Sequence, residues 1–315
     1  MPVGPAAQVV SEPRVSVVMS VYNGASSLRK SIESILSQEG VELEFVVIDD
    51  GSTDCSGAIV DELADRDSRI RVVHQSNTGL TRALIRGCAM ATGTYIARQD
   101  CGDLSLPGRL LAEVQLMEAH PKAALVSCGT RILGPKGESL YDVLIPEEEA
   151  TSKLLADDPD VLRGPWHGSV LFRRDVYERS GGYRREFYFA QDLDLWTRLV
   201  EHGTHQVSPS ILYQASFTLG SISSLQRRNQ LACKRLIVEC ARLRRAGMDE
   251  ANTLAQACAI SMDRRKSQSH DVAAASYFVG MCLRNRGDPR SRQYFWDALR
   301  ANPVHVKAVV RLLLR

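Results

Sequence analysis

The first hundred residues alternate short apolar runs with longer amphipathic stretches. The apolar runs are rich in β-branched residues, and they occupy residues 15–21, 45–48, 70–73 and 95–97. Continuous runs of this kind are typical of strands that are covered on both faces. Between the runs, apolar residues recur at helical spacing, and the stretch after the first run shows this best, with Leu28, Ile32 and Ile35. The pattern predicts strands alternating with helices.

Four strands alternating with helices are typical of an α/β fold with a doubly wound, mostly parallel sheet and helices on both faces. Polar residues follow each strand directly, and those that stand out are Tyr22, Asn23, Asp50, Asn77, Asp100 and Asp103. The carboxyl ends of parallel strands meet at one edge of a sheet. We therefore expect these side chains to line one crevice.

The chain changes character after about residue 220, where helical patterns continue to the end. We expect a leader at residues 1–13, an α/β catalytic domain at 14–220 and an all-helical region at 221–315. Too few repeat units are present for a self-standing solenoid, so the helices are expected to pack back on the α/β domain. The last stretch, 304–315, is amphipathic and basic. It predicts either a helix with a buried apolar face or contact with an anionic membrane surface.

Composition narrows the class of protein. A net charge of +2 over 315 residues predicts no nucleic-acid partner. The eight cysteines include no CxxC pair, which argues against a zinc cluster or a disulfide framework and favours a reducing compartment. Neither a signal-peptide pattern nor an apolar stretch long enough to cross a bilayer is present, so a cytoplasmic location is expected.

The turn that follows the fourth strand carries two carboxylates, Asp100 and Asp103, just before Pro107. Paired carboxylates at the end of a strand can anchor a divalent cation that bridges to phosphates. The simpler interpretation is a polar turn that leads into the next helix. The chain has neither GxGxxG nor GxxxxGK[ST], so a dinucleotide fingerprint and a P-loop are both missing.

Six segments between residues 15 and 203 resemble the family 2 glycosyltransferases, which are inverting GT-A fold enzymes that use nucleotide-diphosphate sugars. These segments are VSVVMSVYNG, FVVIDDGSTD, NTGLTRALIRGCAMATGTYIARQD, DLSLPGRL, WHGSVLFRRDVYERSGGYR and AQDLDLWTRL. The resemblance implies that Tyr22 and Asp50 contact the nucleotide base. Asn23, Asn77 and Asp100, from the same crevice, complete the expected nucleotide site.

The chain departs from the family at the fourth strand, where the usual pattern is Asp-x-Asp-Asp. The corresponding residues are Asp100, Cys101, Gly102 and Asp103, so glycine stands where the family usually has a metal-binding carboxylate. The resemblance implies Mn²⁺ or Mg²⁺ held by Asp103 and Asp100. The glycine leaves three alternatives open, namely that Asp103 turns in, that binding depends on substrate phosphates, or that the enzyme is impaired or metal-independent.

Gln191 and Asp192 precede a Leu-Trp helix in the way that the catalytic motif of the family does, and the resemblance makes Asp192 the catalytic base. Inverting transfer needs one, because the acceptor hydroxyl must lose its proton as it attacks. The alternative is a structural role at the helix start, with Asp194 and Arg198 paired. Similar segments in the family line the acceptor side of the pocket, which here places Trp166, His167 and Gln191 there.

These residues predict an inverting hexosyl- or N-acetylhexosaminyl-transferase. It would move sugar from a UDP- or GDP-sugar to a glycan or lipid-linked glycan in bacterial surface-polysaccharide synthesis. The basic C-terminal stretch adds an expected peripheral contact with the inner face of the cell membrane. The alternative is a catalytically weak nucleotide-sugar-binding or scaffold protein on the same fold, because Gly102 removes a metal ligand.

Overall fold

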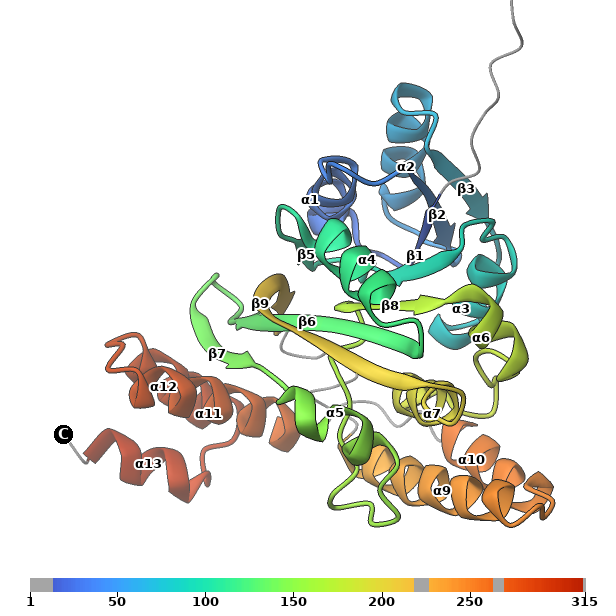
Figure 1. Ribbon diagram of the computed structural model, residues 1–315. Coiled ribbons are helices and arrows are strands. Elements are labelled where there is room, and N and C mark those ends of the chain that lie inside the picture. The colour runs from blue at the N-terminus through green and yellow to red at the C-terminus, as the bar shows by residue number, and fades with distance from the viewer. Residues whose placement is uncertain (1–13, 218–226, 263–268, 314–315) are drawn as a thin grey trace, which may run out of the picture.

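A computed structural model describes residues 14–217, 227–262 and 269–313 of the chain. Within these residues, nine strands form one mixed sheet (Figure 1). The strands are β1 (Val15–Val21), β2 (Leu43–Asp49), β3 (Ile70–His74), β4 (Tyr95–Arg98), β5 (Leu104–Ser105), β6 (Ala123–Leu133), β7 (Ser139–Val143), β8 (Val170–Arg173) and β9 (Thr204–Ser216).

Helices connect and cover the strands. They are α1 (Ala25–Leu36), α2 (Ser56–Arg66), α3 (Leu80–Ala89), α4 (Arg109–Ala119), α5 (Glu147–Leu154), α6 (Arg174–Arg179), α7 (Gln191–Leu199), α9 (Arg227–Arg245), α10 (Ala251–Met262), α11 (Ser269–Asn285), α12 (Ser291–Ala301) and α13 (Val306–Leu313). No helix in the described part of the chain is both long enough and apolar enough to span a membrane.

The sheet has the strand order β3-β2-β1-β4-β8-β6-β9-β5, with β7 paired to β6. The first four strands are parallel, as predicted, and Val15 of β1 faces both Leu43 of β2 and Tyr95 of β4. The chain winds outward from β1 to β3 and then returns to the other side of β1. This reversal is the place where an open α/β sheet binds its ligands.

The second half of the sheet contains antiparallel pairs. Strand β8 lies between β4 and β6 and is antiparallel to both, while β9 runs parallel to β6 and antiparallel to the short β5. The β5–β9 pair brings Ser105 opposite Tyr213. It therefore fastens the turn after β4 to a strand more than a hundred residues later.

Both faces of the sheet are covered, which confirms the predicted α/β architecture. One apolar cluster joins α1, α2 and α4 to the side of the sheet that carries Val17 and Phe45. The other joins α3, α5, α6 and α7 to the side that carries Val18 and Val46. Alternate residues of β1 thus enter opposite cores, as the pleat of a strand requires.

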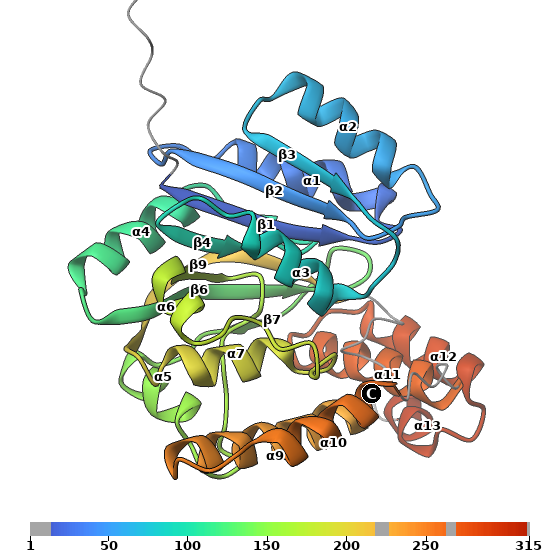
Figure 2. The same ribbon diagram turned by 90° about the vertical axis from the view of Figure 1, so that its right-hand side faces the viewer.

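The C-terminal helices pack back on this sheet, as predicted. Helices α9 and α10 bury Cys233 and Ile237 against Phe187 and Phe189, which precede α7. Helix α11 and the start of α12 pack against β6, β7 and β9. Figure 2 shows α9 and α10 side by side next to α7, with α11, α12 and α13 as a separate group. The predicted leader and the predicted boundary at residues 220/221 lie outside the described residues.

Candidate active site

The loops that follow β1, β2 and β3 and the turn that follows β4 lie at one edge of the sheet and are bonded to one another. The Asn23 side-chain oxygen accepts from the backbone N–H groups of Thr53 and Asp54 at 2.8 and 3.3 Å. The Gly102 N–H donates to Ser31 of α1 at 2.9 Å. Asn23 has a left-handed backbone with φ of 54°, which asparagine tolerates better than most residues. These polar segments therefore lie together at one edge of the sheet, although their side chains do not all line one cavity.

Asp50 joins the loop after β2 to the segment that leads into α3. Its carboxylate accepts from the backbone N–H groups of Thr78 and Gly79 at 2.9 and 2.8 Å, and from the Gln75 amide at 2.7 Å. The residue is only 2% exposed. Asp50 therefore orders the β3–α3 segment, and it lies outside the main cavity described below.

The other expected nucleotide-binding residues on this side are open to solvent. Tyr22 is 53% exposed, and Asn77 is exposed as well. Gly51 fits closely under the segment containing Asn77, because a Cβ there would lie 2.6 Å from the Asn77 nitrogen. Its φ of 77° is also one that side chains disfavour. Tyr22 and Asn77 are thus both accessible to a ligand, whereas Asp50 is buried.

Asp100 is held by a buried cation. One carboxylate oxygen lies 2.6 Å from a guanidinium nitrogen of Arg98, which is completely buried, while the Asp100 carboxylate is partly exposed. The Arg98 guanidinium also donates to the Val18 carbonyl. The other carboxylate oxygen of Asp100 has no partner among the described residues. Arg98 thus fixes one oxygen of Asp100 and leaves the second available.

Asp103 turns inward from the same turn. It is 6% exposed, and its Oδ1 accepts from the Ser216 N–H at 2.9 Å. Burial and the neighbouring Asp100 carboxylate raise the pKa of Asp103 to about 7, although contacts with Ser216, Tyr213 and Trp166 oppose this shift. The Asp103 carboxylate therefore connects the turn to the end of β9 by a hydrogen bond.

The turn after β4 is also where the cation site was expected. No group of three His, Cys, Asp or Glu side chains suited to a metal occurs among the described residues. Asp100 still offers a free carboxylate oxygen, and Mg²⁺ is often held by one or two carboxylates together with substrate phosphates. Carboxylates also suit Mn²⁺. The turn therefore leaves one carboxylate oxygen of Asp100 available to a divalent cation, which would need its other ligands from outside the described side chains.

A cavity of about 520 Å³ opens beside this turn. Asp100 lines it from the end of β4, and Asp192 lines it from the first turn of α7. The remaining lining residues are Leu80, Val143, Leu162, Arg163, Gly164, Pro165, Trp166, His167, Tyr188, Ala190, Gln191, Leu193, Gln230, Leu231 and Lys234. All three expected acceptor-side residues are present, whereas Tyr22, Asn23, Asp50 and Asn77 lie outside.

Asp192 differs from its neighbour Asp194. The Asp192 carboxylate has no hydrogen bond or ion pair with any described residue. Asp194 is buried and lies 2.6 Å from Arg198, which confirms the expected structural pair. The residue before the helix, Ala190, has a φ of 57°. Such strain in a non-glycine residue is common where a site must hold a side chain in place.

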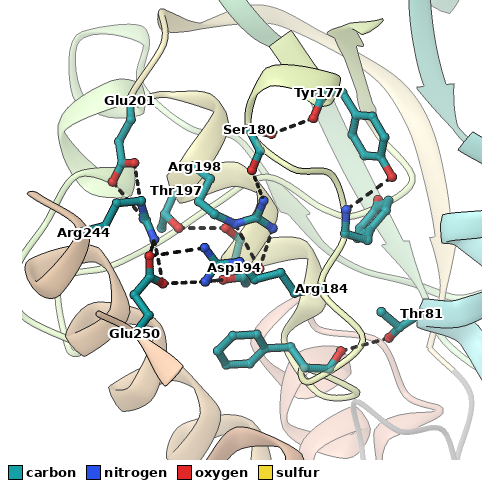
Figure 3. A network of polar contacts seen from close by, with 12 residues as sticks. Thr81, Tyr177, Ser180, Arg184, Asp194, Thr197, Arg198, Glu201, Arg244 and Glu250 are labelled. Carbon is teal, nitrogen blue, oxygen red and sulfur yellow. Dashed lines mark hydrogen bonds and ion pairs between the residues drawn. The ribbon is translucent and has the colours of Figure 1, made fainter. Parts of the chain in front are cut away.

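Polar contacts hold helix α7 in place, and Figure 3 shows them. Arg184 lies 2.6 Å from Glu250, which begins the α10 segment, and 3.9 Å from Asp194. Arg244 of α9 bridges Glu250 and Glu201 at 3.1 and 2.6 Å. The C-terminal helices thus support the helix that carries Asp192.

Sequence reasoning missed several of the residues around the cavity. Arg98 is the last residue of an apolar strand that is covered on both faces. A buried charge at such a position must be paired, so a signal was present. Leu231 and Lys234 of α9, which also line the cavity, were not predicted. The C-terminal helices were expected to pack back on the α/β domain, but no local pattern indicates which of their side chains reach the cavity.

Comparisons with known sequences identify the relatives of this chain. Residues 16–181 match the model of a family described as Glycosyl transferase family 2. EpsE of Bacillus subtilis (strain 168), a glycosyltransferase by name, is 36% identical over 200 residues, which cover 61% of this chain and 69% of EpsE. EpsJ of the same strain, named an uncharacterized glycosyltransferase, is 30% identical over 57% of this chain and 54% of EpsJ.

Solved structures share the fold over nearly the whole chain. S. aureus TarS 1-349 in complex with UDP-GlcNAc superposes with a TM-score of 0.58 at 15% identity, covering 94% of this chain and 89% of TarS 1-349. The mannosyltransferase PcManGT from Pyrobaculum calidifontis, in complex with GDP-Man and Mn²⁺, gives 0.56 at 18% identity, covering 100% and 91%. At these identities the likeness establishes the fold alone.

Proposed function

The chain belongs to glycosyl transferase family 2, and from that membership we propose that it is an inverting enzyme acting on a UDP- or GDP-sugar. It moves a hexose or N-acetylhexosamine to a glycan or lipid-linked glycan, in the synthesis of a bacterial surface polysaccharide. One observation carries the proposal. Asp100 and Asp192, more than ninety residues apart in the sequence, line the same cavity, and the Asp192 carboxylate has no described partner.

The proposed reaction is a single in-line displacement at the anomeric carbon. Asp192 accepts the proton of the acceptor hydroxyl as its oxygen attacks, and the nucleoside diphosphate leaves. The donor enters from the edge where Tyr22, Asn23 and Asn77 lie, with Asp50 keeping the β3–α3 segment in position. Trp166, His167 and Gln191 are assigned to the acceptor side.

We assign the protein's share of the cation site to Asp100, with the donor phosphates supplying further ligands. A bound Mn²⁺ or Mg²⁺ ion would offset the charge that develops on the leaving diphosphate. The complex of PcManGT with Mn²⁺ supports use of a divalent cation on this fold. The family resemblance pairs Asp103 with Asp100 as a ligand. We assign Asp103 a structural role in the turn instead, because its carboxylate is buried against Ser216.

The test is a donor screen, in which hydrolysis of UDP- and GDP-sugars is measured with and without Mn²⁺. For the donor that turns over, Asp192→Asn is expected to lower the rate by about 100- to 10,000-fold, because the general base is lost. Calorimetry should show that nucleotide binding survives. Asp175→Asn, an exposed carboxylate on α6, is the matched control and should retain the wild-type rate.

A second candidate, a scaffold or nucleotide-sugar-binding protein, is favoured by the missing carboxylate at Gly102 and by the buried Asp103. Tight binding of UDP or GDP with no turnover of any donor would support it against the enzyme.

We also propose peripheral membrane contact through α12 and α13, whose outer surface combines apolar and basic residues. Trp296, Val304, Val306 and Leu313 are exposed there, near Lys307. A basic surface of this kind favours anionic lipid. This contact would bring a lipid-linked acceptor to a cytoplasmic enzyme.

A further inference from the structure

His167 lies between the cavity and a buried pair of hydrogen-bond donors. Its Nε2 atom is 3.3 Å from Nε of Arg98 and 2.7 Å from the hydroxyl of Tyr183. Arg98 is fully buried and Tyr183 nearly so, while His167 is 9% exposed. The ring is also held edge-on by Tyr183 and Trp196, with ring centroids 5.8 and 5.9 Å away. The imidazole therefore has one orientation.

The Arg98 contact determines where the ring proton lies. A guanidinium N–H can only donate, so Nε2 of His167 must accept and carries no proton. The Tyr183 hydroxyl then also donates, and burial raises the pKa of Tyr183 well above its usual range. A neutral imidazole whose Nε2 is unprotonated has its proton on Nδ1.

The charges around the ring agree with this assignment. Burial, followed by the Arg98 cation, lowers the pKa of His167, while the Asp100 and Asp192 carboxylates act in the opposite direction. Trp196 and Tyr183, which also pack against the ring, are neutral. Burial and Arg98 thus favour the uncharged form of His167, although two carboxylates line the same cavity.

The protonated nitrogen is the one left for a ligand. Nδ1 has no hydrogen-bond partner among the described residues. It is also not one of the fully buried polar atoms without a partner in that part of the chain. His167 lines the cavity together with Asp192 and Gln191. The Nδ1–H group is therefore a fixed donor on a residue of the cavity wall that Asp192 also lines.

We propose that His167 binds the attacking oxygen of the acceptor through Nδ1–H, and that Arg98 and Tyr183 are positioning residues that lock this tautomer. The inference rests on the proposed function for the identity of the bound oxygen. A hydroxyl that accepts from Nδ1–H directs its own proton elsewhere, and Asp192 is the carboxylate in the cavity without a partner. His167 itself cannot serve as the base, because its only free nitrogen is already protonated.

The lock is tested by NMR on the full chain labelled with ¹⁵N-histidine, with the His167 signals assigned by their loss in His167→Asn. We expect a protonated Nδ1 and an unprotonated Nε2 throughout the neutral pH range. An Nε2–H tautomer, or a ring that becomes an imidazolium in that range, would overturn the proposal. Tyr183→Phe should keep the tautomer because Arg98 remains, whereas Arg98→Met should release it. If Arg98→Met does not fold, the wild type and Tyr183→Phe still decide.

Two variants of His167 separate a donor at Nδ1 from simple packing. The asparagine amide N–H can take the place of Nδ1–H, whereas the glutamine amide reaches the position of Nε2. For hydrolysis of the donor found in the screen, with water as the attacking group, His167→Asn should remain at least tenfold faster than His167→Gln. Equal losses in the two variants would count against the Nδ1 contact.

The two proposals fail in different ways. If no donor is turned over by the wild type, the proposed function is wrong, yet the tautomer seen by NMR still shows whether Arg98 and Tyr183 lock the ring. If Asp192→Asn abolishes hydrolysis while His167 carries its proton on Nε2, the function stands and this inference falls.

Discussion

Four aspartate side chains have different roles in this protein because their partners differ. Asp50 accepts hydrogen bonds from the β3–α3 segment and is buried, while Asp194 is paired with Arg198 inside the fold. Asp103 faces the end of β9. Asp192 alone among these four has no described partner and faces the cavity. An unpaired carboxylate in a cleft is the one free to take a proton.

The proposed cation site has glycine at position 102, and Gly102→Asp tests whether the turn contacts the cation. A side chain there has room, since Ser27 Oγ, the nearest atom, would lie 3.6 Å from the new Cβ. The backbone φ of 99° disfavours any side chain and should cost about 1–3 kcal/mol of stability. We expect the added carboxylate to raise the affinity for Mn²⁺ about tenfold when UDP or GDP is bound, because one more hard ligand is supplied.

Calorimetric titration with Mn²⁺ measures that change, and thermal unfolding measures the cost in stability. Gly102→Ala is the control, because it has the same backbone penalty without a carboxylate. An Mn²⁺ affinity that is equal in the two variants would show that the turn does not contact the cation.

At the scale of secondary-structure elements, helix α7 depends on helices that come later in the chain. Its first turn carries Asp192. An ion pair between Asp194 and Arg198 stabilises the helix from within. Arg184 and Glu250 then connect it to the start of α10, and Arg244 extends the network into α9 (Figure 3). The helical region is therefore part of the active-site support.

Glu250→Gln should destabilise the protein by about 2 kcal/mol, because it leaves Arg184 and Arg244 mostly buried with less negative charge beside them. Donor hydrolysis should also fall, since α7 loses a support. Urea unfolding provides the stability measurement. Glu178→Gln, which breaks an exposed pair with Arg174, should change stability by no more than about 0.5 kcal/mol. A similar effect for both substitutions would show that the network does not support α7.

At the scale of the whole molecule, the sheet edge that carries the site and the basic C-terminal helices are separate parts of one chain. Helix α13 contacts the rest of the protein through Ala308 and Leu312, which join a small cluster with Phe295 and Ala298 of α12. Its other side remains exposed at the periphery of the molecule (Figure 1). This arrangement leaves an apolar and basic surface available for a membrane.

Vesicle flotation tests that surface. The protein should float with phosphatidylglycerol vesicles and not with phosphatidylcholine vesicles. Lys307→Glu with Arg300→Glu should weaken vesicle binding by at least about thirtyfold, because two lost basic residues at about 1 kcal/mol each amount to about 2 kcal/mol. Lys30→Glu with Lys122→Glu, which reverses two exposed charges elsewhere, is the matched control. Unchanged flotation in the α12–α13 variant would refute the membrane contact.

Local patterns in the sequence predicted the parts of this protein that depend on near neighbours. The period of apolar residues indicated the first four strands and the helices between them, because side-chain spacing follows backbone geometry. The order of those strands then placed Asn23, Asp50 and Asp100 at one edge of the sheet, since parallel strands end on the same side. The experiments described above test the roles that the family resemblance implies for the site residues.

Only the tertiary structure decided which of the predicted residues are buried or paired and which can contact a ligand. It buried Asp50 and Asp103, brought Arg98 to His167 across 69 residues of sequence, and laid α9 over the cavity that holds Asp192. Such contacts join residues with no shared local pattern, and they form because burying one charge or polar group requires a partner wherever the fold can supply it. The chemistry available in the cleft therefore depends on long-range packing.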